Sequence, residues 1–350
     1  MSEDHVDDFT WADLLTDLVA KRDMDRDTAA AAMQRVLSGK LTPVQIAGFA
    51  VALRAKGETA DEIAGMAEGM ISHATPVELD RNAVDIVGTG GDRANTVNVS
   101  TMAALVAAGA GAKVVKHGNR AASSACGTAD CLEALGVGID IEPQRQAAVL
   151  DEVGMAFLFA PRYHASLRYA APARKELGIQ TTFNLLGPLT NPARPYAAAI
   201  GIADAAMAPL VADVLAKRGT RGLVFHGDDG LDELTTTTKS RVWVISDGTV
   251  AETEIDPAAL DLAPAAPADL VGGDPKVNAG VVRKVLAGEH GPVRDIVLLN
   301  AAAALLAYDG PKTDQDVVSQ LAQELERAAQ SIDSGAANDR LDRWIAVTSN

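Results

Sequence analysis

The sequence predicts an α/β fold, with a small N-terminal helical domain and a larger α/β domain whose mostly parallel central sheet is flanked by helices. Residues 10–75 show consecutive amphipathic helical patterns without a strand between them. After Pro76, short apolar runs alternate with glycine-rich loops and helical stretches, as strand–helix–strand units do. Aromatic residues make up only 4% of the chain, so Ala, Val, Leu and Ile must form a closely packed core.

Three threonines mark helix starts in the first segment. Thr10 precedes an apolar run with an acidic first turn, Thr42 is followed by proline and then by glutamine at the third position, and Thr59 has Glu62 at the third position. These are N-cap and capping-box patterns, in which side chains satisfy the free N–H groups of the first turn. We expect residues 1–78 to form the helical domain and residues 79–350 the α/β domain.

The second segment contains short apolar runs of strand length, several of which precede glycine or polar loops. We expect strands at 84–87, 113–116, 155–160, 223–226 and 242–245, and helices at 100–110, 129–135, 293–308 and 313–332. Residues 257–275 are rich in Pro, Ala and Gly and are expected to be irregular.

Composition narrows the functional class. A net charge of −16 argues against a broad surface for nucleic acid or anionic membranes, so any phosphate binding should be local. The acidic N-terminus lacks the pattern of a signal peptide, and no apolar run reaches the length of a membrane span. Cys126 and Cys131 have no metal-binding spacing and are expected to be small buried thiols. Together these features predict a cytoplasmic enzyme.

The first candidate loop runs from Gly88 to Asp92, directly after the strand at 84–87. Its glycines allow a ligand to approach the backbone closely, and Asn98, Ser100 and Thr101 follow at the start of a helix. Free N–H groups and hydroxyls there favour a phosphate site, although a plain strand-to-helix turn would use similar residues. The spacing fits neither the dinucleotide-binding fingerprint nor the phosphate loop of ATPases.

A second loop, from Lys116 to Ser124, also follows a predicted strand. Lys116 and Arg120 supply positive charge, while Ser123 and Ser124 supply hydroxyl donors. That combination suits a diphosphate or a phosphate ester, whereas a solvated loop with scattered charges is the alternative.

A third segment, Asp232-Glu233, follows the strand at 223–226. By itself it is more typical of an exposed acidic turn, but adjacent carboxylates can hold Mg²⁺ together with substrate phosphate oxygens. Arg174 lies among small residues and could bind a carboxylate, although a lone arginine is more often a surface residue. His164 alone would more often be structural.

Taken together, these segments resemble the anthranilate phosphoribosyltransferase family in order and spacing, from about residue 10 onward. The resemblance rests on 88–92, 98–101, 116–124, 184–192 and Asp232-Glu233. It implies a homodimer, Mg²⁺ as the cofactor, and phosphoribosyl diphosphate and anthranilate as substrates. It also implies that residues 165–190 join the helical domain. Two departures are Thr128, where the family usually has serine, and Arg93, where a smaller residue is common.

The resemblance implies a role for each matching residue. The implied catalytic residues are Lys116, Asn119 and Arg174, and the implied metal ligands are Ser100, Asp232 and Glu233. The implied contacts to phosphoribosyl diphosphate are Gly88, Gly91, Asp92, Thr96, Asn98, Val99, Ser100, Thr101, Lys116, His117, Gly118, Asn119, Arg120, Ala121, Ala122, Ser123, Ser124 and Thr128. The implied contacts to anthranilate are Gly88, His117, Asn119, Pro161, Tyr163, His164 and Arg174.

Two other functions fit part of the pattern. A pyrimidine nucleoside phosphorylase resembles this family in fold, but a carboxylate pair suits a metal-bound diphosphate donor better than free phosphate. A non-catalytic paralogue that binds nucleic acid would need a basic surface, which the net charge of −16 disfavours.

Overall fold

Four helices at the start of the chain pack together into a bundle. The computed structural model describes residues 9–121, 124–312 and 314–349. The expected N-caps are confirmed: Thr10 accepts a hydrogen bond from the backbone of Asp13, and Thr42 and Thr59 each form a complete capping box. The four helices are α1 (Trp11–Val19), α2 (Arg26–Leu37), α3 (Pro43–Lys56) and α4 (Ala60–Ser72).

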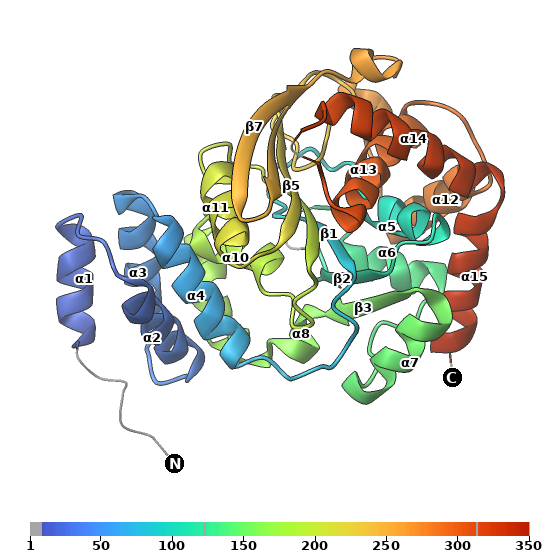
Figure 1. Cartoon of the computed structure of the whole chain (residues 1–350). Coiled ribbons are helices and arrows are strands. Elements are labelled where there is room, and N and C mark those ends of the chain that lie inside the picture. Colours follow the sequence, from blue (N-terminus) through green and yellow to red (C-terminus); the bar gives the residue numbers. More distant parts are fainter. Residues whose placement is uncertain (1–8, 122–123, 313, 350) are drawn as a thin grey trace.

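A seven-stranded sheet forms the centre of the rest of the chain (Figure 1). Its order is β3-β2-β1-β4-β5-β6-β7, with β1 to β5 parallel and the last two strands antiparallel. The parallel strands therefore place their carboxyl ends at one edge. The strands are β1 (Val84–Gly88), β2 (Val114–Gly118), β3 (Met155–Phe159), β4 (Ala197–Gly201), β5 (Arg221–Gly227), β6 (Ser240–Ser246) and β7 (Thr249–Ile255).

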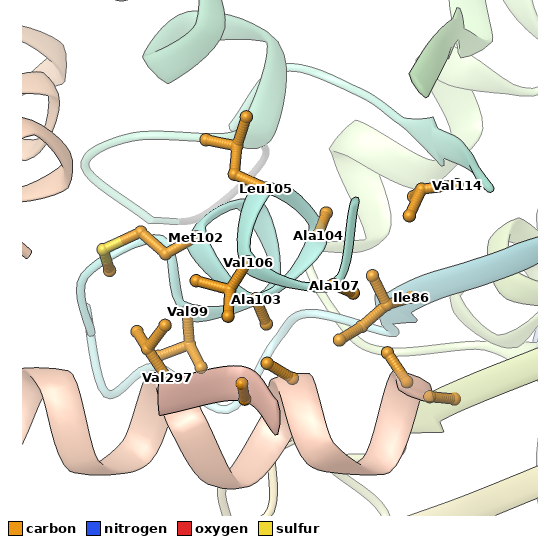
Figure 2. Close-up of a cluster of buried hydrophobic side chains, with 14 of the residues drawn as sticks. Ile86, Val99, Met102, Ala103, Ala104, Leu105, Val106, Ala107, Val114 and Val297 are labelled. Atoms are coloured by element: carbon orange, nitrogen blue, oxygen red, sulfur yellow. The ribbon is translucent and has the colours of Figure 1, made fainter. Parts of the chain in front are cut away.

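One face of the sheet is covered by helices that pack with small side chains. Figure 2 shows Val99, Ala103 and Val106 of α5 lying against the helix that carries Val297, which is α13. Alanines on both helices are fully buried and allow the backbones to approach closely. The helices of this part are α5 (Val99–Gly109), α6 (Thr128–Leu135), α7 (Pro143–Val153), α12 (Pro275–Leu286), α13 (Pro292–Asp309), α14 (Val317–Asp333) and α15 (Ala336–Thr348).

The other face packs toward the bundle (Figure 1). One buried cluster joins Phe49 of α3 with Ala170, Leu186, Ile200 and Trp243, so the bundle and the sheet share a core. Residues 165–190 touch α2, α3 and α4, and we propose that they belong to the helical domain, with its first boundary near residue 78. The segments are α8 (Ala160–Tyr163), the 3₁₀ turn η1 (Ala165–Tyr169), α9 (Ala171–Leu177), α10 (Thr182–Leu189) and α11 (Ala208–Lys217).

Several elements were not expected from the sequence. Strand β4 is mostly alanine, which is a weak strand former, but every residue of β4 is buried in the middle of the sheet. The irregular stretch 257–275 contains two short 3₁₀ turns, η2 (Pro257–Leu260) and η3 (Pro267–Leu270). Helices α11, α12 and α15 and strand β7 were also missed. In the described part of the chain, no helix combines the length and the apolar character needed to cross a membrane.

Asp85 is a buried carboxylate within the sheet, and its hydrogen bonds are supplied by side chain and backbone. It accepts from the His117 backbone at 3.1 Å and from Asn191 Nδ2 at 2.9 Å. Burial nevertheless raises the pKa of Asp85 to about 6. Asn191 also donates to the carbonyl of Val115 at 2.8 Å, so one amide ties the loop before β4 to two strands.

Replacing Asn191 by leucine is expected to lower the free energy of unfolding by about 2 kcal/mol, because Asp85 and a strand carbonyl lose a donor. Urea denaturation measures the change. Asn82, which is exposed, is the matched control, and Asn82→Leu should stay within about 0.5 kcal/mol of the parent chain. Equal effects from the two substitutions would contradict the structural role given to Asn191.

Candidate active site

Three loops meet at the carboxyl edge of the parallel strands. They follow β1, β2 and β5, and β1 lies between β2 and β4 in the sheet. The loops carry the glycine run that begins at Gly88, the basic run that begins at Lys116, and the acidic pair Asp232-Glu233. The structure therefore brings together the three segments that the sequence singled out.

The glycine loop touches the acidic segment directly. The Gly90 N–H donates to Asp232 Oδ2 at 2.6 Å, and a Cβ added at Gly88 would lie 2.0 Å from the same oxygen. Gly91 has a φ of +87°, a backbone conformation that favours glycine. Glycine is therefore required at position 88, because any side chain there would overlap the Asp232 carboxylate.

Gly88→Ala is expected to lower kcat/KM at least about a hundredfold, because the new methyl group displaces the Asp232 carboxylate by an ångström or more. Steady-state kinetics with varied donor concentration measures the loss. Gly280 of α12 has no neighbour within 4 Å of an added Cβ and serves as the matched control. If Gly88→Ala were as active as Gly280→Ala, the close contact between Gly88 and the Asp232 carboxylate would not matter for activity.

The start of α5 follows the glycine loop and leaves one backbone donor of its first turn unused. Its N-cap residue, Asn98, makes no side-chain bond to the helix; its amide instead donates to the Cys126 carbonyl at 3.2 Å and accepts from Asn278 Nδ2 at 2.8 Å. The N–H groups of Val99 and Thr101 donate to the carbonyls of Val97, at 2.7 Å, and Asn98, at 3.1 Å, and their side chains are buried. The Ser100 N–H has no hydrogen-bond acceptor among the described residues, so it is the first-turn donor that remains available to an anion. Thr96 lies two residues before Asn98, and its backbone forms an isolated β-bridge with Val271.

Lys116 is a fully buried cation in the middle of β2. Its Nζ donates to the Ile86 carbonyl and to Ser100 Oγ, the latter at 3.2 Å. Burial lowers the pKa of Lys116 to about 8, against the opposing attraction of Asp85, Asp232 and Glu233. The ammonium group remains mostly protonated at neutral pH, so it provides a fixed positive charge between the first two loops.

The rest of the basic loop leads to the start of α6. Asn119 is exposed, and its Oδ1 accepts from the Arg120 backbone at 2.7 Å. The Arg120 guanidinium is engaged by Asp130 and Glu133, so it reaches back along α6. Ala121 is held by its N–H to Asp130, and Ser124 Oγ donates to the Cys126 carbonyl at 3.4 Å. Thr128 is the first residue of α6, and Ala122 and Ser123 lie outside the described residues.

The acidic pair gains a third member in the structure. Ligand oxygens of Asp92, Asp232 and Glu233 all lie within 4.8 Å of one another, among the residues described. Burial and the neighbouring carboxylates raise the pKa of Asp232 to about 7 and that of Glu233 well above its usual range. Buried Glu233 Oε2 has no hydrogen-bond partner among the described residues. Such a cluster is short of positive charge and fits a divalent cation.

Asp92 had been assigned from the sequence to donor binding alone. The spacing of 140 residues between Asp92 and Asp232 gave no signal that the two carboxylates would meet. Ser100 was expected among the metal ligands, and its hydroxyl lies beside Lys116 Nζ.

Arg174 of α9 is the residue that the resemblance assigns to the acceptor carboxylate. No hydrogen bond or ion pair of its guanidinium is found among the described residues; its charge lies 5.7 Å from the centroid of the Phe183 ring. Burial lowers the pKa of Arg174, because a desolvated charge without a partner is unfavourable. A carboxylate from a bound ligand would supply the missing partner.

Two histidines lie side by side near the end of β2. The rings of His117 and His164 are 5.2 Å apart, edge to face, and burial lowers their pKa values to about 3 and about 4. Both are therefore neutral, and each ring bonds a carbonyl of α10 or of the residue after it. Pro161 is the second residue of α8, and Tyr163 is buried in a cluster with Val115 and Leu158.

Gln180 was not singled out from the sequence. Its Nε2 donates to the Gly91 carbonyl at 2.8 Å, so the segment that follows Arg174 touches the glycine loop. An isolated glutamine between two helices has no motif, and only the fold places it at the site.

The comparisons with known proteins agree on one family. Residues 80–338 match the family described as glycosyl transferase family, a/b domain, and residues 12–74 match glycosyl transferase family, helical bundle domain. The chain is 57% identical over 335 residues to the anthranilate phosphoribosyltransferase of Saccharopolyspora erythraea, which covers 96% of this chain and 95% of that protein. The enzyme of that name from Thermobifida fusca is 55% identical and covers 96% of each chain.

Solved structures give the same result. The anthranilate phosphoribosyltransferase of Thermus thermophilus superposes with a TM-score of 0.89 at 39% identity, covering 97% of this chain and all of that one. The enzyme of Saccharomyces cerevisiae in complex with PRPP (phosphoribosyl diphosphate) and Mg has a TM-score of 0.87 at 27% identity, covering 98% and 99%. The same yeast enzyme with 4-fluoroanthranilate has a TM-score of 0.85 at 27% identity, covering 97% and 99%.

Proposed function

This chain belongs to the anthranilate phosphoribosyltransferase family, and we propose that its site transfers the 5-phosphoribosyl group from phosphoribosyl diphosphate to the amine of anthranilate, releasing diphosphate. The chain is a glycosyltransferase of tryptophan biosynthesis. The observation that supports this site best is the cluster of Asp92, Asp232 and Glu233 beside two anion-binding loops. Diphosphate is a ligand that needs both a cation and many N–H donors.

Mg²⁺ is the cofactor of the proposed reaction, and the residues present fit it. Three carboxylates converge, the pKa values of Asp232 and Glu233 are raised in its absence, and Glu233 Oε2 has no partner among the described residues. Oxygen ligands of this kind suit a hard divalent cation that also takes phosphate oxygens and water. When bound, Mg²⁺ would neutralise negative charge that builds on the leaving diphosphate.

The chain's own donors would hold phosphoribosyl diphosphate. We propose that the Gly88–Asp92 backbone, the Ser100 N–H of α5 and the start of α6 supply N–H groups, with Ser100 and Thr128 supplying hydroxyls. The buried Lys116 ammonium keeps its charge at neutral pH and would stabilise the diphosphate as the bond to ribose C1 breaks. The other contacts to phosphoribosyl diphosphate that the resemblance implies remain predictions.

The acceptor is proposed to lie between Arg174 and the second loop. Arg174 would bind the anthranilate carboxylate, and Asn119, in the same loop as Lys116, would position the ring. Neutral His117 and His164 would form a wall without placing a competing positive charge near the amine. An aromatic amine is a modest nucleophile, so orientation toward an activated ribose C1 would supply much of the rate.

The direct test is a mixture of purified protein, Mg²⁺, phosphoribosyl diphosphate and anthranilate, followed through the loss of anthranilate fluorescence. Loss that requires all four components is the expected result. A parallel reaction with thymidine and phosphate checks for nucleoside phosphorolysis, which should not occur. Retained donor binding with no loss of anthranilate would overturn the assignment.

We further propose a cytoplasmic homodimer that contacts itself through the helical domain. Val19 of α1 and Val44 and Val51 of α3 are apolar residues that are 75%, 81% and 41% exposed. Val44 and Val51 lie two turns apart on the same helical stripe, which an interface would cover. The two free, buried cysteines suit a reducing compartment.

Val44→Glu is expected to shift the protein from dimer to monomer, because a carboxylate would be buried without a partner at the interface. Light scattering after size-exclusion chromatography measures the mass. Val277 of α12 is also exposed, at 52%, and Val277→Glu should leave the dimer intact. A parent chain that is already monomeric, or two variants with equal mass, would contradict the proposed surface.

A further inference from the structure

A second polar cleft lies at the opposite edge of the sheet from the proposed active site. Its volume is about 300 Å³, and its walls come from α2, α4, the ends of α10 and α11, and the segments that enter β1, β4 and β5. Four arginines line it, against two carboxylates, on a chain with a net charge of −16. The four are Arg26, Arg81, Arg194 and Arg218.

Arg218, at the end of α11, is the innermost of these cations. Its Nη1 donates to the Leu189 carbonyl at 2.6 Å, but its Nη2 is buried and has no hydrogen-bond partner among the residues that the structure describes. Burial, together with the charges of Arg194 and Arg26 and against the opposing charge of Glu68, lowers the pKa of Arg218 to about 10. A buried guanidinium nitrogen without an acceptor is unfavourable unless a ligand supplies one.

The other three arginines differ in how firmly they are engaged. Arg26 is paired with Glu68, and Arg81 donates to the Arg194 carbonyl at 2.7 Å and stacks on Tyr196. No side-chain hydrogen bond or ion pair of Arg194 is found within the described ranges, although its backbone is held at a φ of +51°, a conformation that non-glycine residues rarely adopt. The guanidinium groups of Arg194 and Arg218 therefore both retain unused donors.

The two carboxylates of the cleft do not neutralise the positive charge of Arg194 and Arg218. Glu68 is already shared with Arg26, and Asp85 accepts from Asn191 and from the His117 backbone. The remaining walls include the apolar side chains of Ile71 and Leu215. Apolar walls exclude water and strengthen the attraction between a guanidinium and an anion.

We propose that this cleft is a second anion site, separate from the donor site, that binds a phosphate group through Arg194 and Arg218. Planar guanidinium groups with free N–H donors match the oxygens of a phosphate, and the site has room for the body of a phosphate monoester beside Ile71 and Leu215. The bound group would connect α2 and α4 of the bundle with the amino ends of the strands. The site does not depend on the transferase reaction.

The test is calorimetric titration of inorganic phosphate into the full chain saturated with phosphoribosyl diphosphate and Mg²⁺, without anthranilate. Saturation blocks the donor site and is checked first by direct titration of the donor. Phosphate should bind the parent chain at one site per chain, and Arg194→Gln and Arg218→Gln should each weaken it about tenfold, because each removes one charged hydrogen-bonding partner. Phenyl phosphate in a second titration shows whether the apolar walls add affinity, which would identify a monoester rather than free phosphate as the ligand.

Arg22→Gln is the matched control, because Arg22 is an exposed arginine of the bundle that pairs with Asp17 outside the cleft. Its phosphate affinity should equal that of the parent chain. If Arg218→Gln fails to fold by circular dichroism, Arg194→Gln still decides the question, because the Arg194 side chain is exposed and makes no hydrogen bond or ion pair with the described residues. No binding of either phosphate compound to the saturated parent chain, or equal binding by the Arg194 and Arg22 variants, would overturn the proposal.

Discussion

Asp232→Asn is expected to abolish most of the transferase activity and, in the absence of metal, to make the protein more stable at neutral pH. Asparagine keeps an oxygen for the Gly90 N–H but removes one negative charge from the cluster with Asp92 and Glu233. We expect kcat/KM to fall at least about a hundredfold, since a metal ligand that stabilises the leaving group is lost. Kinetics across a Mg²⁺ series measures the fall.

The gain in stability follows from the raised pKa of Asp232. Its value is about 7 in the folded chain against 3.8 ordinarily, so the folded state binds its proton more tightly than the unfolded state does. In the metal-free parent, the stability that Asp232 contributes should therefore be fully present below about pH 4 and be lost as the pH rises toward 7, by an amount of order a few kcal/mol. Asp232→Asn should flatten this part of the profile.

Asp228 provides the control, because it is an exposed carboxylate in the same turn. Asp228→Asn should keep both the activity and the pH profile of the parent chain. Thermal melting from pH 4 to pH 8, with and without Mg²⁺, separates the two variants. If the difference in stability between the metal-free parent and Asp232→Asn stayed constant over that range, the carboxylates would not be held in repulsion.

Arg174→Ala is expected to raise the KM for anthranilate about a hundredfold while leaving the KM for phosphoribosyl diphosphate nearly unchanged. The guanidinium has no hydrogen-bond or ion-pair partner among the described residues, so its removal disturbs little of the protein's own structure. A charged hydrogen-bonding partner for the substrate carboxylate is worth about 1.5–3 kcal/mol, which corresponds to a factor of ten to more than a hundred.

Aniline, which has no carboxylate, identifies the group that Arg174 binds. The parent chain and Arg174→Ala should use aniline equally poorly, because the interaction is missing in both cases. Arg168, an exposed arginine just before α9, is the control, and Arg168→Ala should behave like the parent chain. If Arg174→Ala weakened aniline and anthranilate alike, Arg174 would have a structural role instead.

The predictable parts of the fold were those with a local signal. Two such signals are the capping boxes at Thr42 and Thr59 and the apolar run of β1. Each lies within a few residues of the chain, and each predicted element was confirmed. Strand β4 could not be predicted, because its alanines favour a helix unless the neighbouring strands bury them. The tertiary environment, rather than intrinsic propensity, decides such segments.

The site divides in the same way. The glycine loop and Lys116 could be read from chain motifs, because each follows a strand and the carboxyl ends of parallel strands meet. The third carboxylate, Asp92, and the contact of Gln180 depend on residues distant in the chain. The sequence does not distinguish Arg174 from a surface arginine. Only the structure shows that its guanidinium has no hydrogen-bond or ion-pair partner among the described residues.

The hydrogen bond from Gln180 to the Gly91 carbonyl has a thermodynamic consequence. Gln180 follows Arg174 on one segment, while Gly91 belongs to the loop proposed to hold the donor. A donor that repositions the loop must also alter the energy of the segment that captures the acceptor. By linkage, the acceptor then changes donor affinity by the same factor by which the donor changes acceptor affinity. Gln180→Ala should reduce that shared factor toward one, even though Gln180 is assigned no contact with either substrate.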